Sequence, residues 1–419
     1  MSCTEWKEYK LDEVYEVSNG LSKKREEFGF GYEFLAFTDV FNNYFVPQTL
    51  DNLVNSSEME RVKCSIKRGD VFLTRTSEKL DELGRSCVAL KDYPNATFNG
   101  FTKRLRPIGN VEILPEYAGY YFRSLKFRNA VTSMSSMTTR ASLNNDMISV
   151  LTITVPTLEE QEKIANILSS LDEKIELNNE MNKTLEEMAQ SIFKRWFVNF
   201  EFPSEDGKPY KSSDGEMVDS ELGMIPKGWE VKELSQLVNI ITKSEKPFEN
   251  EDILYEHFSI PALDSNKLPI LEFGNSISSN KYKIDNDCIL ISKLNPNNKR
   301  IWNPYCNTSN SICSTEFIVY KAINNYPKSY IYEIINSDEF TKFLVANATG
   351  STGSRQRVKP KDTLGYKIVL PTIDKIIEID KILSPIHKNI QLNTQESNTI
   401  LQIRNTLLPK LMSGEIKVN

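Results

Sequence analysis

The feature that most constrains this chain is a long helical pattern that occurs twice. Residues 158–196 contain no Gly or Pro and place apolar residues at alternating spacings of four and three. This heptad spacing predicts a helix whose apolar seam requires a partner along its length. At about 1.5 Å per residue, the helix would span roughly 60 Å. A shift of 215 residues brings the same pattern onto residues 373–411.

The two seams are also interrupted at the same place. Asn178 and Asn182 lie in the first seam, and the shift of 215 residues places Asn178 on Asn393. A buried asparagine in such a seam lowers stability but fixes the register. We therefore predict that the helices pack on each other, antiparallel; the alternative is that each packs only on its own globular domain. The predicted seam comprises Ile164, Leu168, Leu171, Ile175, Asn178, Asn182, Leu185, Ile192, Ile379, Leu383, Ile386, Ile390, Asn393, Ile400 and Leu407.

The remainder of the chain is duplicated as well. Trp6 falls on Trp229, and strand-like runs at 70–75 and 150–155 fall on 287–293 and 367–370. Further strands are predicted at 97–105 and 315–321, and amphipathic helices at 115–128 and 329–344. The predicted fold is α+β, with two similar α/β-mixed domains in pseudo-twofold arrangement, separated by two long antiparallel helices packed as a coiled coil. The predicted boundaries are 1–156 for the first globular domain, 157–200 for the central helix, 201–228 for an acidic linker, 229–371 for the second domain and 372–419 for the C-terminal helix.

Charge is distributed unevenly along the chain. The net charge of −6 argues weakly against nucleic acid binding. However, residues 157–187 carry nine acids and three bases, whereas residues 61–110 carry eleven bases and five acids. Residues 342–361 carry five bases and no acid. Because local patches bind phosphates, the basic globular stretches remain candidates for a nucleic acid surface.

Two polar loops, at 133–145 and 347–359, combine hydroxyl groups with arginine and lysine. Such side chains bind phosphate oxygens, and arginine can bind guanine through two hydrogen bonds. The alternative is an ordinary solvated loop. Together with bases at strand ends, the candidate DNA contacts are Arg75, Lys103, Arg104, Thr139, Arg140, Lys293, Ser351, Ser354, Arg355, Arg357 and Lys359.

No catalytic or metal-binding pattern is found. The six cysteines form no CxxC pair, and the two histidines complete no zinc set. Asn303-Pro304-Tyr305 lacks one proline of the Asn-Pro-Pro-aromatic tetrapeptide of amino-methyltransferases, and we interpret it as a turn. No apolar window is long enough for a transmembrane helix, and no signal peptide is apparent. We expect a cytoplasmic, non-catalytic protein without a cofactor or metal of its own.

Three phrases resemble the specificity subunit of type I restriction–modification systems. They are VPTLEEQEKI at residues 155–164, SELGMIPKGW at 220–229 and LMSGEI at 411–416. They stand in the order in which this family has them, and the resemblance covers nearly the whole chain.

This resemblance implies that residues 1–156 and 229–371 are target recognition domains, each of which reads one half of a bipartite site in double-stranded DNA. The helices would set the spacer and bind two modification subunits, and two restriction subunits would join them. S-adenosylmethionine, ATP and Mg would belong to those partners. The alternatives are a coiled-coil scaffold without DNA contact, a methyltransferase-associated specificity protein without a restriction partner, and a self-contained methyltransferase.

Overall fold

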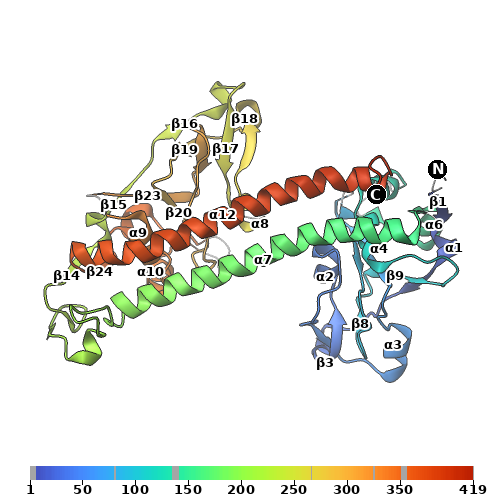
Figure 1. Ribbon diagram of the computed structural model, residues 1–419, viewed down its shortest axis with the longest axis horizontal. Helices are drawn as coiled ribbons and strands as arrows, with labels where there is room; N and C mark the ends of the chain where they lie inside the picture. Colours follow the sequence, from blue (N-terminus) through green and yellow to red (C-terminus); the bar gives the residue numbers. More distant parts are fainter. Residues whose placement is uncertain are drawn as a thin grey trace. The chain divides into compact units, whose positions relative to one another are not determined.

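The structure is a computed structural model that describes residues 6–79, 82–134, 141–265, 267–323, 326–350 and 356–418. The chain forms two compact units. Unit 1 comprises Met1–Ile175 with Thr399–Asn419, and unit 2 comprises Glu176–Asn398. Two long helices, α7 (Leu158–Phe197) and α12 (Ile373–Met412), contribute one part to each unit. Figure 1 shows α7 in green and α12 in red.

Unit 1 combines short strands with short helices. Its strands are β1 (Lys7–Lys10), β2 (Tyr15–Asn19), β3 (Phe28–Leu35), β4 (Leu53–Val54), β5 (Val71–Thr74), β6 (Thr76–Ser77), β7 (Ser86–Val88), β8 (Thr97–Phe98), β9 (Thr102–Pro107), β10 (Ala141–Ser142) and β11 (Thr152–Val155). Its short helices are α1 (Leu11–Val14), α2 (Phe37–Asn42), α3 (Glu58–Lys63), α4 (Pro115–Tyr121), α5 (Leu125–Ser133) and α6 (Asn145–Val150).

Unit 2 has the same kinds of element. Its strands are β12 (Met217–Val218), β13 (Ile225–Pro226), β14 (Glu230–Glu233), β15 (Val238–Ile240), β16 (Ser244–Glu245), β17 (Leu254–Phe258), β18 (Ile270–Phe273), β19 (Lys281–Lys283), β20 (Cys288–Ser292), β21 (Ile301–Trp302), β22 (Ser311–Ser314), β23 (Phe317–Ala322) and β24 (Lys367–Leu370). Its short helices are α8 (Ile260–Ser265), α9 (Lys328–Ile335), α10 (Asp338–Ala346) and α11 (Pro360–Thr363).

The two units share the topology of their four-stranded sheets. The four-stranded sheet has the order β2-β9-β5-β7 in unit 1 and β15-β23-β20-β21 in unit 2. A second sheet contains a parallel pair in each unit, β3 with β8 and β17 with β22. In each unit an early strand pairs antiparallel with the last strand before the long helix: β1 pairs with β11, and β14, the first strand after residues 201–228, pairs with β24. The predicted fold class, with two similar α/β-mixed domains and two long helices, is confirmed.

One inner strand of each four-stranded sheet, β5 or β20, is buried on both faces because its residues before the final hydroxyl residue are apolar. Successive side chains of a strand point to opposite faces. In unit 1, Val71 and Leu73 therefore enter one core, and Phe72 enters another. In unit 2, Ile289 and Leu290 divide in the same way. The sheet thus stands between two apolar layers and gives a rigid base to the loops at its ends.

Several predicted elements are divided in the structure. The strand predicted at 97–105 is two strands, β8 and β9, which are separated by a turn. The helix predicted at 115–128 is α4 followed by α5, because the Ser124 hydroxyl accepts a hydrogen bond from the Phe127 N–H and starts a new helix. Ser337 starts α10 in the same way, with Phe340 as the donor (3.1 Å).

The segment 201–228, predicted to be an acidic linker, has a folded structure of its own. It contains the antiparallel pair β12 and β13. Phe202 and Ile225 are 4% and 3% exposed and belong to the main apolar core of unit 2. Phe202 also stacks on Trp229, with ring centroids 4.8 Å apart. Its aromatic residues give this segment enough apolar surface to pack, in spite of its acidic composition.

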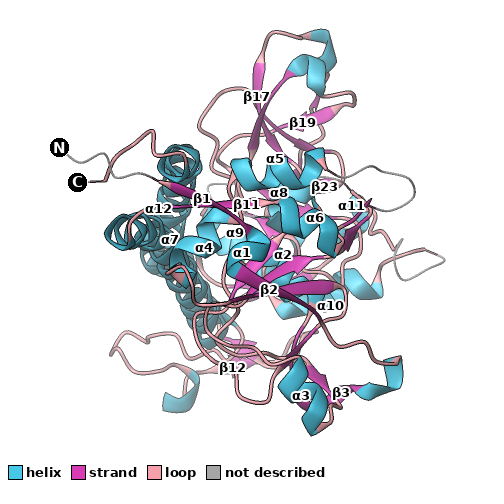
Figure 2. Cartoon of the chain, turned by 90° about the vertical axis from the view of Figure 1, so that its right-hand side faces the viewer, coloured by secondary structure: helices cyan, strands magenta, loops and turns pink. Residues whose placement is uncertain are grey.

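The long helices lie side by side and run antiparallel (Figures 1 and 2). In unit 2, Asn178 Nδ2 donates to Ser397 Oγ (3.2 Å), and Asn182 Nδ2 donates to Thr394 Oγ1 (3.2 Å). Residue numbers increase along α7 as the numbers of their partners on α12 decrease, so the two helices are antiparallel. Each helix also packs on a globular part of the chain. Leu168 of α7 lies in the main apolar core of unit 1, and Leu383 of α12 lies in that of unit 2. Both predicted packing modes therefore occur together.

Candidate nucleic-acid interface

In unit 1, an exposed arginine stands at the end of the buried strand β5. Arg75 follows Thr74, the last residue of β5, and its side chain is exposed. Its backbone is held on both sides: the Arg75 N–H donates to the Phe101 carbonyl (2.8 Å), and the Arg75 carbonyl accepts from the Leu143 N–H (2.8 Å). These backbone hydrogen bonds therefore fix the position from which the Arg75 side chain extends into solvent.

The same backbone arrangement recurs in unit 2 around Lys293, which follows β20, is half-buried and donates from Nζ to the Thr315 carbonyl (2.6 Å). The Lys293 N–H donates to the Glu316 carbonyl (3.0 Å), and the Lys293 carbonyl accepts from the Val358 N–H (2.9 Å). Val358 stands between Arg357 and Lys359, which are both exposed. The structure thus brings Lys293, Arg357 and Lys359 together from segments that lie far apart in the sequence.

These surfaces have the chemistry of a nucleic acid contact. Exposed arginine and lysine bind phosphate oxygens, and arginine also reads guanine edges. Arg357 Nη2 lies 3.3 Å from Glu316 Oε1, and the two side chains are 58% and 33% exposed. Because such an exposed ion pair contributes little to stability, about 0–1 kcal/mol, this pair can exchange its contact for one with a ligand at small cost.

Two of the predicted contact residues are instead buried. Lys103 and Arg104 on β9 are 6% and 5% exposed. Lys103 Nζ donates to Asn19 Oδ1 (2.6 Å) and Asn145 Oδ1 (2.7 Å), and burial lowers the pKa of this ammonium group. The Arg104 guanidinium donates to the Ser65 carbonyl (2.8 Å), and burial lowers its pKa as well. The expectation that both lie on an exposed basic face is wrong, because both side chains are buried and form hydrogen bonds inside unit 1.

Five further candidates, Thr139, Arg140, Ser351, Ser354 and Arg355, lie outside the described residues. Their role as DNA contacts stays a prediction. The same holds for the roles of Arg75, Lys293, Arg357 and Lys359, whose placement the structure gives but whose ligand it does not contain.

Sequence reasoning missed the two residues that accept the backbone hydrogen bonds at these strand ends. The predicted strands at 97–105 and 315–321 include Phe101 and Glu316, whereas both residues precede the strands β9 and β23 in the structure. The dipeptide Asn99-Gly100 could have indicated the turn before β9, because such pairs mark turns. The Phe101 N–H donates to Asn99 Oδ1 (2.7 Å), which closes that turn.

A polar layer crosses the helix pair inside unit 2. Asn178 is fully buried, and its Nδ2 donates to the Asn393 carbonyl (3.3 Å) of α12. Asn393 Nδ2 in turn donates to Asn182 Oδ1 (2.9 Å). Because each of these bonds requires one alignment of the two helices, the layer can define their register.

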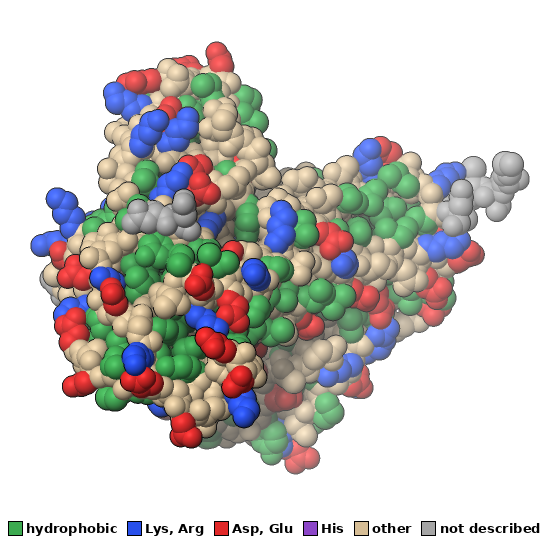
Figure 3. All heavy atoms as spheres, turned by 60° about the vertical axis from the view of Figure 1, so that its left-hand side comes forward, with side chains coloured by type: hydrophobic (Ala, Val, Ile, Leu, Met, Phe, Trp, Pro, Cys, Tyr) green, Lys and Arg blue, Asp and Glu red, His purple; other side chains and the backbone are tan. Residues whose placement is uncertain are grey.

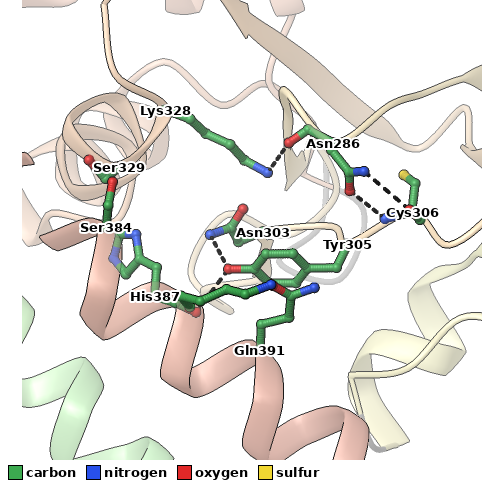
Figure 4. A pocket seen from close by; sticks show the side chains of 10 residues that line it. Asn286, Asn303, Tyr305, Cys306, Lys328, Ser329, Ser384, His387 and Gln391 are labelled. Atoms are coloured by element: carbon green, nitrogen blue, oxygen red, sulfur yellow. Dashed lines mark hydrogen bonds between the residues drawn. The ribbon is translucent and has the colours of Figure 1, made fainter.

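A cavity of about 350 Å³ in unit 2 lies beside α12. Asn303 and Tyr305 of the turn Asn303-Pro304-Tyr305 line it (Figure 4). The Tyr305 hydroxyl donates to the His387 carbonyl of α12 (3.0 Å). Lys328 Nζ donates to the Asn286 carbonyl (2.6 Å) and to the Pro304 carbonyl (3.2 Å). The turn therefore connects the globular part of unit 2 to its long helix.

Acidic and basic side chains are interspersed over the face shown in Figure 3. Among the described residues, no helix is long and apolar enough to cross a membrane. No group of three or more His, Cys, Asp or Glu side chains in the described part of the chain is arranged to hold a metal ion.

Comparison with known proteins supplies the context for this geometry. Residues 4–187 match the family model described as the type I restriction modification DNA specificity domain. The chain is 24% identical over 429 residues to the type I restriction enzyme MjaIX specificity subunit of Methanocaldococcus jannaschii, covering 99% of this chain and 94% of the relative. It is 26% identical over 491 residues to the HindI specificity subunit of Haemophilus influenzae, covering 99% and 100%. A crystal structure of the type I restriction–modification S subunit from M. genitalium matches with a TM-score of 0.57 at 16% identity, over 97% and 96% of the two chains, and supports the fold.

Proposed function

We propose that this chain, which belongs to the family of type I restriction–modification specificity subunits, reads a bipartite site in double-stranded DNA with one domain per half-site. The duplicated sheet carries this proposal. In each unit a base, Arg75 or Lys293, follows the buried strand β5 or β20, and its backbone is held by two equivalent hydrogen bonds. Two copies of one presentation surface suit two half-sites.

The division of labour follows the predicted boundaries. Residues 1–156 and 229–371 act as target recognition domains, and residues 201–228 connect the first helix to the second domain. The long helices, at 157–200 and 372–419, set the number of base pairs between the half-sites. The polar layer at Asn178 supports this role, because a spacer of constant length requires one helix register.

The helices also offer a docking surface for modification subunits. On α7, Leu177, Met181 and Met188 are 50%, 43% and 48% exposed and, at spacings of four and seven residues, share one face of the helix. Acidic residues surround them on the same helix. We propose that two modification subunits bind this spine and that two restriction subunits join the assembly in the cytoplasm.

In this assembly the chain selects the site and the partners supply the chemistry. The modification subunits would carry S-adenosylmethionine and methylate adenine, and ATP and Mg would serve the restriction subunits. The chain itself would contribute binding and positioning. A methyltransferase-associated specificity protein without a restriction partner would have the same recognition function.

A domain exchange tests the proposal. Residues 1–156 are replaced by the equivalent domain of another family member, and the chimera is coexpressed with the modification subunit of the parent system. Methylation mapping of the host genome should show one new half-site, with the other half and the spacer unchanged. A change in both halves would contradict one-domain-per-half reading. If the parent complex gave no bipartite motif and no specific DNA binding, the protein would be a scaffold instead.

A further inference from the structure

The turn before β9 and the turn before β23 place Phe101 and Glu316 in equivalent positions. In unit 1, Thr74 pairs with Thr102, and the next residues, Arg75 and Phe101, are joined by a backbone hydrogen bond of 2.8 Å. In unit 2, Ser292 pairs with Phe317, and Lys293 and Glu316 are joined in the same way at 3.0 Å. The identical register makes these two positions structural counterparts.

A third position is matched by the adjoining segment. The Leu143 N–H donates to the Arg75 carbonyl (2.8 Å), and the Val358 N–H donates to the Lys293 carbonyl (2.9 Å). The residues that precede these donors, Ser142 and Arg357, are therefore also counterparts, and both are exposed. Each unit thus presents three side chains from one backbone frame.

The chemistry of the three positions differs in a way that the fold does not require. The base at the strand end is present in both units. Its neighbours are Phe101 and Ser142 in unit 1, but Glu316 and Arg357 in unit 2. Phe101 is 62% exposed, so the apolar core of unit 1 does not account for an aromatic residue there. The Glu316 side chain is 33% exposed, and its Oε1 lies 3.3 Å from Arg357 Nη2.

We propose that these side chains determine which base pair each unit accepts, an assignment that rests on the function proposed above. Phe101 makes an apolar contact with a thymine methyl group in the major groove. Glu316 and Arg357 read one G·C pair together: the guanidinium donates to guanine O6 and N7, and the carboxylate accepts from the cytosine N4 amino group. Arg75 contacts a phosphate oxygen and positions unit 1 on the DNA. Lys293 does the same in unit 2 by exchanging the bond from its Nζ to the Thr315 carbonyl (2.6 Å) for a phosphate contact.

Exchange of the variable positions tests this assignment. Two full-length double variants, F101E/S142R and E316F/R357S, are each coexpressed with the parent modification subunit. The methylated motifs of the host genome are then mapped. F101E/S142R should change one A·T pair to G·C in one half-site and leave the other half unchanged. E316F/R357S should make the reverse change in the other half-site. Each variant should lose the parental base preference by about tenfold or more.

Matched controls separate this result from a general disturbance. Ile108→Glu places a carboxylate at another exposed position (52%) beyond β9 and should leave the motif unchanged. Where a variant complex methylates too weakly for mapping, its preferred site is selected from randomised DNA by binding. A parental motif for both double variants, by either readout, would overturn the assignment. If the unaltered complex itself yielded no bipartite motif, the proposed function would fail first, so the two failures are distinguishable.

Discussion

At the scale of single residues, matched positions of the two units have acquired different structural roles. Asp70 precedes β5 and is fully buried, and Arg106 holds it through two hydrogen bonds, of 2.7 Å from Nε and 2.6 Å from Nη2. Its sequence counterpart Asp287 precedes β20, but its side chain is 73% exposed and lies 3.4 Å from Lys321. The duplication preserved the residue, and burial decides how much it contributes to stability.

Asp70→Asn should lower the free energy of unfolding by about 3–5 kcal/mol, because it leaves the Arg106 guanidinium half-buried without its counterion. Asp287→Asn removes the same charge from a solvated pair and should cost less than about 1 kcal/mol. Thermal and urea unfolding of the full chain would compare the two variants. Equal losses would show that burial of Asp70 has no energetic weight.

Protonation of Lys328, which lies where the globular part of unit 2 meets α12, should make the stability of the protein depend on pH. Burial is the main cause that lowers its pKa from the ordinary 10.5 to about 8. Below pH 8 the ammonium group is charged in both states, and its burial opposes folding. Between pH 8 and 10.5 the folded state releases the proton before the unfolded state does, so this group's contribution to stability increases with pH.

We therefore expect the melting temperature of the parent protein relative to Lys328→Met to rise from pH 7.5 to pH 10. Lys388→Met, at an exposed position on the rim of the same cavity, serves as the control and should show no such trend. A difference between parent and Lys328→Met that stayed constant over this range would mean that Lys328 keeps an ordinary pKa.

At the scale of elements, the long helices could be predicted because their evidence is periodic and local. The seam spacing and the matched asparagines are enough to predict that the two helices pack on each other. Shorter elements were predicted less well, since a single hydroxyl such as that of Ser124 can end one helix and begin another. The burial of Lys103 could not be predicted, because its partner Asn19 lies far away in the sequence and only the fold brings the two together.

A matched insertion in both helices tests their role as a spacer. Seven residues are added after Ile175 in α7 and after Asn398 in α12, which preserves the heptad phase. Seven residues lengthen a helix by about 10 Å, or about three base pairs at roughly 3.4 Å each. The methylated motif should therefore keep both half-sites and gain about three unspecified base pairs. An active complex with the parental spacer would refute the spacer role.

An insertion in α7 alone provides the control for this experiment. The polar layer at Asn178 could then form only if the contact between Asp172 and Arg404 (2.5 Å) were lost, or the reverse. We expect a lower melting temperature and weaker methylation without a defined new spacer. Stability equal to that of the double insertion would mean that the polar contacts do not fix the register.

At the scale of the whole molecule, the net charge of −6 and the proposed DNA binding seem opposed. The structure resolves this, because the excess of acids lies on α7 and the segment 201–228, which together carry 16 acids and eight bases, while the candidate interface presents its own exposed bases. A phosphate contact acts within about a Debye length, roughly 8–10 Å in physiological salt. Affinity for DNA should therefore depend on a few local cations and not on the sum over the chain.

Salt dependence distinguishes these two origins of binding. In the assembled complex, Arg75→Ala and Lys359→Ala should each reduce the slope of log K against log salt concentration by about 0.9, the amount expected for one lost phosphate contact. Arg68→Ala changes the net charge equally, but Arg68 is paired with Glu116 at 2.8 Å on unit 1 and should leave the slope unchanged. If all three variants reduced the slope alike, the total charge would govern binding. If only the first two did, the strand-end frames would be the DNA contact, because the three variants differ in the place of the charge and not in its amount.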